Sequence, residues 1–156
     1  MTGMDVLRRV YAYSKDMDRL RLRRMCAYDA MTRCTRSTDA AGYGDVGDKM
    51  ARYAAKVDDV DRAIEARKKM RDMEMDEALE LIGGLTEAAQ GMAMYRGWVC
   101  GMTIRQTAAE LKISESSVRG LRRRGREILD AVETRLDTDH QYRELEEIYL
   151  NAENAH

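Results

Sequence analysis

The chain has no proline and no phenylalanine, and among its 156 residues it has only one tryptophan and two histidines. Proline is the residue least compatible with a helix interior, so a chain without it has few strong helix breakers. Twelve methionines, together with frequent alanine, arginine, glutamate and leucine, supply good helix formers instead. The composition therefore predicts an all-α protein.

Long apolar runs are also missing. No stretch approaches the roughly 18 consecutive apolar residues that a transmembrane helix needs. The first 25 residues carry six arginines and one lysine without an apolar block, which is unlike a secretory signal. We therefore expect no membrane partner and a cytoplasmic location.

Residues for metal binding or nucleophilic catalysis are sparse. Cys26, Cys34 and Cys100 form no CxxC pair, and neither His140 nor His156 has a cysteine nearby, so a zinc site and a disulfide framework are not predicted. A serine or cysteine nucleophile would need a histidine to accept its proton, but His140 lies in an acidic stretch. We expect a binding protein rather than an enzyme, with no metal and no cofactor.

The net charge of −1 conceals an uneven distribution. Residues 1–37 carry nine basic and four acidic side chains, and residues 103–129 carry seven basic and three acidic ones. Residues 130–156 carry two basic and eight acidic side chains. Because charges more than about 8 Å apart are largely screened, a partner responds to these local charges rather than to the total. The segment 103–129 is thus suited to an acidic partner.

Two long helices are predicted in the first half of the chain, over about 4–36 and 46–82, with a glycine-rich loop at 37–47. A short loop favours an antiparallel helical hairpin, which would form an arm over residues 1–84. Two narrow apolar stripes leave methionine and tyrosine flanks uncovered, so the arm is predicted to form a coiled-coil-like homodimer. The stripes have spacings of three and four residues, at Val6, Val10, Tyr13, Met17, Leu20, Arg24, Ala27 and Met31, then Met50, Tyr53, Val57, Val60 and Ile64.

The arginines of the first helix are spread around it rather than gathered on one face. We therefore expect them to pair with acidic residues of the second helix rather than to contact a nucleic acid. The residues concerned are Arg19, Arg21, Arg23 and Arg24, with Asp58, Asp59, Asp61 and Glu65 as the expected partners.

Residues 85–137 are predicted to form a trihelical helix-turn-helix domain, followed by an acidic helix or tail at 138–156. Thr103 and Gln106 have the spacing of a capping box, in which each side chain accepts from the other residue's amide. Ser114 is placed to cap the next helix. The expected core of this domain comprises Ile104, Ala108, Leu111, Ile113, Val118 and Leu121.

The helix that follows Ser114 has two different faces. At 100° per residue, its apolar side chains gather on one side, and serine, arginine and Glu115 gather on another. Such a helix suits the major groove of DNA, where serine and arginine reach base edges and phosphates. The alternative is that Arg122, Arg123 and Arg124 are a solvated face answering acidic residues downstream. DNA contacts are expected from Thr103, Gln106, Ser114, Glu115, Ser116, Ser117, Arg119, Gly120, Arg122, Arg123 and Arg126.

The run from Trp98 to Ser114, with Val118 and Arg119, resembles region 4 of sigma factors, the module that reads the −35 promoter element. The chain as a whole resembles small phage and prophage proteins that combine a region-4-like C-terminus with a helical N-terminal arm. One residue departs from that pattern, because Lys112 stands where the turn usually has glycine. The resemblance implies a helix-turn-helix fold, double-stranded DNA as partner, RNA polymerase as a second partner, and transcription regulation in a bacterial host cell.

Two other functions stay open at the level of sequence. Small terminase subunits, which recognise DNA for packaging, also combine a helix-turn-helix with long helices, although their DNA module is usually N-terminal. A phage inhibitor of host polymerase or of a defence system would act by protein contact, and the acidic segment 130–156 would suit it. Subunit number separates packaging, which needs a large ring, from regulation, which needs a monomer or dimer.

Overall fold

The computed structural model describes residues 1–36, 43–134 and 140–155. Within these ranges all regular structure is helical, which confirms the all-α prediction, and the one extended pairing is an isolated bridge between Thr2 and Glu133. The elements are α1 (Gly3–Arg36), α2 (Tyr43–Gly83), α3 (Ala88–Met94), the π-helical turn η2 (Tyr95–Val99), α4 (Ile104–Leu111), α5 (Glu115–Asp130) and α6 (His140–Asn154).

The start of α2 differs from the sequence prediction. The helix begins at Tyr43 rather than near residue 46, so Gly44 and Gly47 lie inside it rather than in the predicted loop 37–47. A glycine in a helix costs only about 1 kcal/mol relative to alanine, which a helix of 41 residues outweighs. The rest of that loop, residues 37–42, lies outside the described residues.

The chain divides into two compact units that are not contiguous in sequence. Unit 1 consists of residues 1–14 and 70–137, and unit 2 consists of residues 15–69 and 138–156. The sequence pattern, in contrast, predicts domains made of successive segments, 1–84, 85–137 and 138–156. The difference arises because α1 and α2 are long enough for the two ends of each helix to belong to different compact units.

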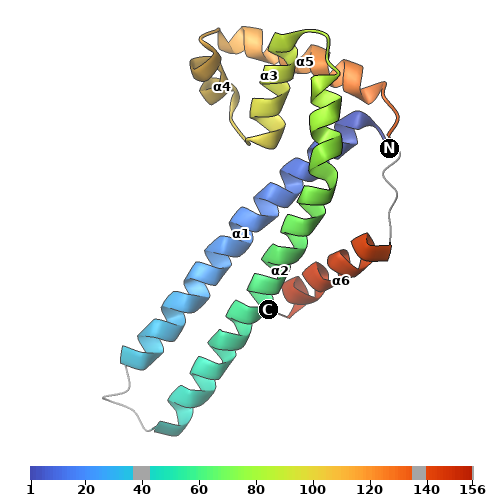
Figure 1. Ribbon diagram of the computed structural model, residues 1–156. Helices are drawn as coiled ribbons and strands as arrows, with labels where there is room; N and C mark the ends of the chain where they lie inside the picture. The colour runs from blue at the N-terminus through green and yellow to red at the C-terminus, as the bar shows by residue number, and fades with distance from the viewer. Residues whose placement is uncertain (37–42, 135–139, 156) are drawn as a thin grey trace. The chain divides into compact units, whose positions relative to one another are not determined.

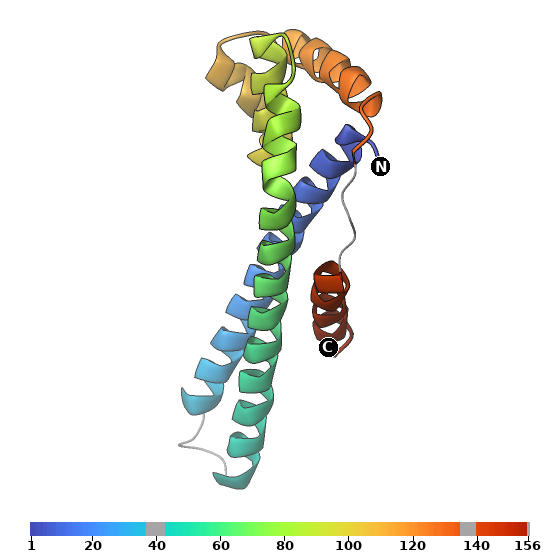
Figure 2. The same ribbon diagram turned by 45° about the vertical axis from the view of Figure 1, so that its right-hand side comes forward.

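The core of unit 1 combines the first turns of α1 with the last turns of α2 and with the helices that follow. In Figures 1 and 2, α3, α4 and α5 gather around these ends of the two long helices. Met4, Leu7 and Met94 are fully buried there. Burying side chains of this size stabilises the unit by about 1.5–3 kcal/mol each. The other buried members of the cluster are Val6, Val10, Ala78, Ile82, Leu85 and Leu129.

The start of α1 is fastened to the end of α5. The side chains of Thr2 and Asp5 accept hydrogen bonds from each other's backbone amides, at 3.3 and 3.0 Å respectively, in the manner of a capping box. The pKa of Asp5 is lowered mainly because its carboxylate accepts the hydrogen bond from the Thr2 backbone amide. The Gly3 amide donates to the Val132 carbonyl at 2.8 Å. These bonds satisfy amides that would otherwise lack partners at the helix N-terminus.

In unit 2, α6 packs against α1 and α2. Its Tyr149 is buried together with Leu20 of α1 and with Val60 and Ala63 of α2. Helix α6 therefore covers part of the apolar stripes of α1 and α2, which two helices alone were expected to leave uncovered. The predicted acidic segment 138–156 contains this helix, and residues 138, 139 and 156 lie outside the described residues.

A buried arginine holds the three helices of unit 2 together. The Arg67 guanidinium lies 3.1 Å from a carboxylate oxygen of Asp16 and 2.8 Å from one of Glu146. Its Cζ atom also lies 3.4 Å from the centre of the Tyr149 ring, the arrangement of a cation–π contact. Burial alone would lower the pKa of Arg67, but the hydrogen bond to Glu146 and the two carboxylate charges raise it above its usual value.

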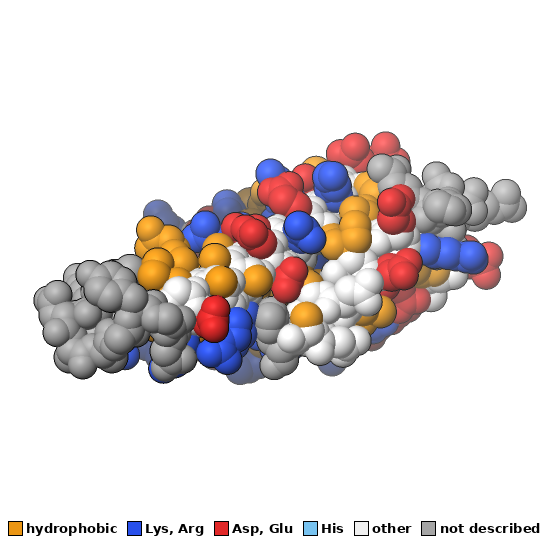
Figure 3. All heavy atoms as spheres, turned by 90° about the horizontal axis from the view of Figure 1, so that it is seen from below, with side chains coloured by type: hydrophobic (Ala, Val, Ile, Leu, Met, Phe, Trp, Pro, Cys, Tyr) orange, Lys and Arg blue, Asp and Glu red, His pale blue; other side chains and the backbone are white. Residues whose placement is uncertain are grey.

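The arginines of α1 in unit 2 whose side chains are described also have acidic partners. Arg24 pairs with Asp61 at 2.6 Å, as predicted. The remaining partners differ from the prediction, because α6 and α1 itself supply carboxylates closer than those of α2. The pairs are Arg19 with Asp16 and Glu153, Arg21 with Asp18, Arg23 with Glu153, and Arg33 with Asp29. Figure 3 shows basic and acidic side chains interspersed across one face of the molecule.

Candidate functional site

Helix α5 buries one face and exposes the other. Val118, Leu121, Gly125 and Leu129 are buried where the helix packs against α3 and α4. Gly125 allows a close approach, because a Cβ atom there would lie 2.8 Å from the Met94 side chain. The buried face fixes the orientation of α5, so the polar residues on its other side point outward as a set.

Local capping positions α4 and α5. The Thr103 hydroxyl accepts from the Gln106 amide at 3.1 Å, and the Gln106 side chain accepts from the Thr103 amide at 2.9 Å, which confirms the predicted capping box. The Ser114 hydroxyl accepts from the Ser117 amide at 3.1 Å at the start of α5, also as predicted. Thr103, Gln106, Ser114 and Ser117 are therefore engaged in holding the two helix N-termini.

The turn between α4 and α5 has one unusual backbone conformation. Lys112 has a φ of 56°, in the left-handed region that glycine adopts more easily than lysine. Its conformation ends α4 and brings the Ile113 amide to the Ala108 carbonyl at 3.1 Å. The prediction that Ile113 is a core residue was wrong: its side chain is 37% exposed, because the turn carries it outside both helices.

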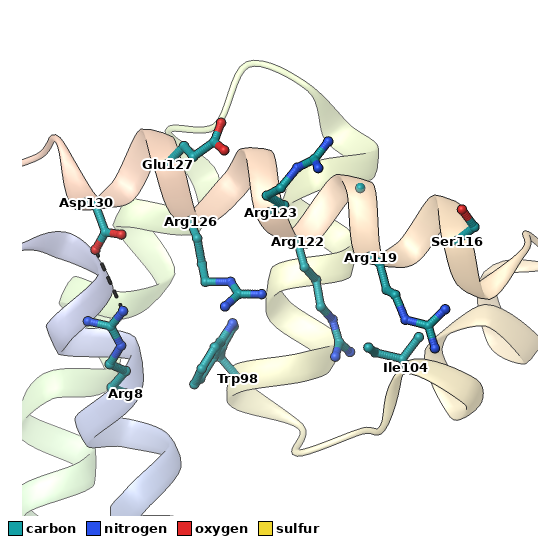
Figure 4. A pocket seen from close by; sticks show the side chains of 11 residues that line it. Arg8, Trp98, Ile104, Ser116, Arg119, Arg122, Arg123, Arg126, Glu127 and Asp130 are labelled. Carbon is teal, nitrogen blue, oxygen red and sulfur yellow. Dashed lines mark ion pairs between the residues drawn. The ribbon is translucent and has the colours of Figure 1, made fainter.

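An open groove of about 820 Å³ runs along α5. Figure 4 shows Arg119, Arg122 and Arg126 extending from α5 towards Ile104 and Trp98, which form the opposite side. The groove thus has guanidinium groups along one wall and an apolar surface along the other. Its lining also includes Arg8, Ser116, Gly120, Arg123, Glu127 and Asp130.

Arg122 is held inside unit 1 rather than presented outward. Its guanidinium donates to the carbonyl oxygens of Ala93 and Met102 at 3.3 and 3.2 Å, and to the Thr107 hydroxyl at 2.7 Å. Burial, followed by the charge of Arg126, lowers its pKa. The sequence predicted Arg122 as a DNA contact, but the structure uses its donors to join α3, α4 and α5.

Glycine leaves room beside this arginine. A Cβ atom at Gly97 would lie 2.7 Å from Cζ of Arg122, so the guanidinium would have to shift to accommodate a larger residue. The π-helical turn η2 brings this glycine against the guanidinium, and the neighbouring Trp98 packs edge-on against Tyr11, with ring centres 5.6 Å apart. The turn therefore supplies both the space for Arg122 and the aromatic wall of the groove.

Three of the α5 arginines that line the groove keep exposed guanidinium groups. Arg119 lies 3.4 Å from Glu115 one turn earlier, and both side chains are exposed. Arg123 and Arg126 have no carboxylate within 4.0 Å among the residues that the structure describes. Arg124, on the same helix but outside the groove, has none within those residues either. The exposed side of α5 is thus a surface of positive charge that its own unit does not neutralise.

The structure brings six of the predicted site residues to one groove and leaves five outside it. The six are Ser116, Arg119, Gly120, Arg122, Arg123 and Arg126, and the five are Thr103, Gln106, Ser114, Glu115 and Ser117. Sequence reasoning missed the opposite wall, since it treated Trp98 only as part of the run that resembles sigma region 4 and Ile104 only as a core residue. An aromatic residue shortly before a basic helix was the one available signal.

Protein-family models, curated proteins and solved structures were compared with this chain, and none matches it. The described helices include none that combines the length and the apolar character needed to cross a membrane. Among the same residues, no group of three or more His, Cys, Asp or Glu side chains could hold a metal ion. The groove along α5 is therefore argued from its own geometry and charge.

Proposed function

We propose that this protein is a sequence-specific DNA-binding transcription regulator, of the phage and prophage type that the sequence resembles, with α5 as its recognition helix. The observation that carries the proposal is the row of Ser116, Arg119, Arg123 and Arg126 along the exposed side of α5, opposite a fully buried face. Arg123 and Arg126 have no carboxylate partner among the described residues, and Arg119 has only an exposed pair with Glu115 at 3.4 Å. Such arginines suit a polyanionic ligand, because binding breaks no ion pair at two of them and only a weak, exposed one at the third.

The dimensions of α5 fit this role. From Ser116 to Arg126 the helix advances about 15 Å at 1.5 Å per residue, and the major groove of B-DNA is about 12 Å wide. Side chains near the start of α5 can therefore reach base edges while those further along meet the phosphates of the groove wall. In this arrangement α4, the turn at Lys112 and α5 act as the helix-turn-helix, with α4 lying across the DNA backbone.

Arg119 and Arg126 are assigned different tasks. Arg119 lies in the first two turns of α5 and reads a base, for which arginine most often uses the O6 and N7 atoms of guanine. Arg126 lies two turns further along, where it contacts a phosphate. Glu115 disfavours a nearby phosphate, so it limits non-specific binding and can accept from a cytosine amino group.

The proposal is tested by selecting bound fragments from random duplex DNA and then titrating variants on the selected site and on a scrambled duplex. Arg119→Ala should lose about 1–3 kcal/mol on the selected site and much less on the scrambled one. Arg126→Ala should weaken both equally and reduce the salt slope by about one. Arg124→Ala, on the same helix outside the groove, should lose less than either.

The same experiment separates the other functions. Binding of both duplexes by Arg119→Ala as by wild type would exclude α5 as the reading helix. A wild-type protein that binds no duplex at low salt would favour an inhibitor acting through protein contact. A ring of eight or so subunits in light scattering would favour a packaging role, whereas regulation requires a monomer or dimer.

A further inference from the structure

One apolar surface of unit 2 is left open on α1. Leu22, Met25 and Tyr28 are 55, 62 and 53% exposed, which is unusual for three large side chains in succession. Residues three apart on a helix lie about 60° apart around its axis, so these three form one strip roughly 120° wide. The buried residue Leu20 lies about 140° from Met25 around the helix axis and packs against the rest of unit 2.

The strip is flanked by opposite charges at equal distances from its centre. Arg21 precedes Met25 by four residues and Asp29 follows it by four residues. Both charged side chains are exposed and pair only within α1, Arg21 with Asp18 at 3.4 Å and Asp29 with Arg33 at 2.9 Å. Ion pairs of this exposed kind are weak, so the same groups can exchange partners at low cost.

This pattern is complementary to itself. A two-fold axis through Met25, perpendicular to α1, places each residue of one helix over the residue equally far from Met25 in the opposite direction on the other. Leu22 then lies over Tyr28 of the second copy, Met25 over Met25, and Arg21 over Asp29. Apolar residues meet apolar residues and opposite charges meet, as an isologous interface requires.

We infer that two copies of this chain pair through the Leu22–Met25–Tyr28 strip, with their α1 helices antiparallel. The inference goes beyond the proposed function and does not rest on it. Two copies would present two α5 helices, the arrangement by which many DNA-binding proteins recognise two-fold symmetric sites. Because the strip is small, the pairing is expected to be reversible in the micromolar range, at about 1–50 µM.

Sedimentation of the full-length chain tests this inference over about 1–100 µM. Met25→Glu places two carboxylates together at the axis and should weaken dimerisation more than about tenfold. Met73→Glu is the matched control, because it changes an exposed methionine of α2 that is 41% exposed and lies outside the strip. A wild-type monomer at the highest concentration, or equal dimerisation by Met25→Glu and wild type, would overturn the inference.

Charge reversal tests the antiparallel register. Arg21→Asp and Asp29→Arg should each weaken the dimer by roughly three- to tenfold, because each sets two like charges against each other twice. The double variant restores both intermolecular pairs while leaving like charges within each helix, so its dimer should recover to within about twofold of wild type. A double variant weaker than either single one would rule out this register. Circular dichroism of every variant confirms that the helices persist.

Discussion

Arginines are abundant on both α1 and α5, but the two helices surround them differently. Every arginine of α1 whose side chain is described lies within 4.0 Å of a carboxylate, and those in unit 2 draw on Asp16, Asp18, Asp29, Asp61 and Glu153. On α5 only Arg119 has such a partner among the described residues. The number of arginines is thus a poor guide to an anion-binding surface, and the charge left unpaired after folding is a better one.

Arg122 and Arg123 differ in the same way within α5, because Arg122 donates hydrogen bonds inside unit 1 and Arg123 is exposed. Arg122→Ala should destabilise the fold by about 3 kcal/mol, because it leaves the Ala93 and Met102 carbonyl oxygens without their donor. Arg123→Ala, one residue along, should change stability by less than about 0.5 kcal/mol. Urea unfolding of both variants measures the difference, and equal losses would show that Arg122 is no more structural than its neighbour.

A substitution in the turn before α5 tests the strain of its backbone without changing the arginines of the groove. Lys112→Gly should stabilise the fold by about 0.5–1 kcal/mol, because glycine adopts the φ of 56° without strain. Lys112→Ala is the control for the removed charge and should give no such gain, since alanine keeps the Cβ atom. Thermal unfolding compares the two variants, and a similar rise in melting temperature for both would contradict the backbone explanation.

Glu74 is a buried carboxylate of α2 that pairs with Arg9 of α1 in unit 1, and its burial makes the stability of the fold depend on pH. Burial raises the pKa of Glu74 above its usual value, although Arg9 at 2.6 Å and the Tyr13 hydroxyl oppose the shift. The folded state therefore holds the Glu74 proton more tightly than the unfolded state does. As pH rises from the ordinary glutamate pKa through the raised one, this residue's contribution to stability falls.

Glu74→Gln removes that titration. The wild type should lose stability relative to Glu74→Gln as the pH rises through this window, and the difference should be constant outside it. Urea unfolding at closely spaced pH values from acid to neutral gives the difference directly. A wild type that gains stability relative to the variant over the same window would reverse the sign and show that the Arg9 charge dominates.

The smallest expected effect belongs to an exposed pair of the arm. Arg24 and Asp61 are each 45% exposed, so their ion pair is largely screened by water. A double-mutant cycle with Arg24→Ala and Asp61→Ala should give a coupling energy of about 0.5 kcal/mol. A coupling above about 2 kcal/mol would mean that this pair stabilises the fold as a buried ion pair does, like the pairs of Arg67 with Asp16 and Glu146.

What could be predicted from the sequence was mostly local. The capping box of Thr103 and Gln106, the Ser114 cap and the two faces of α5 depend on residues within a few positions of one another, and the structure has each of them. Lys112, which stands where the turn of the resembling proteins usually has glycine, has the positive φ that glycine adopts most easily. Such features are set by backbone hydrogen bonding and by helical periodicity, which a single sequence shows.

What could not be predicted depends on tertiary neighbours. Helical periodicity places Arg122 nearer than Arg123 to the buried face of α5, but it does not show which groups Arg122 meets there. Its half-buried place beside Gly97 and its hydrogen bond to Thr107 depend on tertiary packing. The docking of α6 in unit 2 likewise depends on Arg67 meeting Glu146 from the far end of the chain. Contacts between residues so distant in sequence leave no periodic signal.

The central claim is that the exposed arginines of α5, of which only Arg119 has a carboxylate partner among the described residues, form the DNA-binding surface, and that the paired arginines of α1 do not. Its most direct test is the salt dependence of duplex binding by two double variants that remove equal charge, Arg123→Ala with Arg126→Ala and Arg21→Ala with Arg24→Ala. The first should reduce the slope of log K against log salt by about two, and the second should leave it unchanged. Equal slopes for the two double variants would contradict the account.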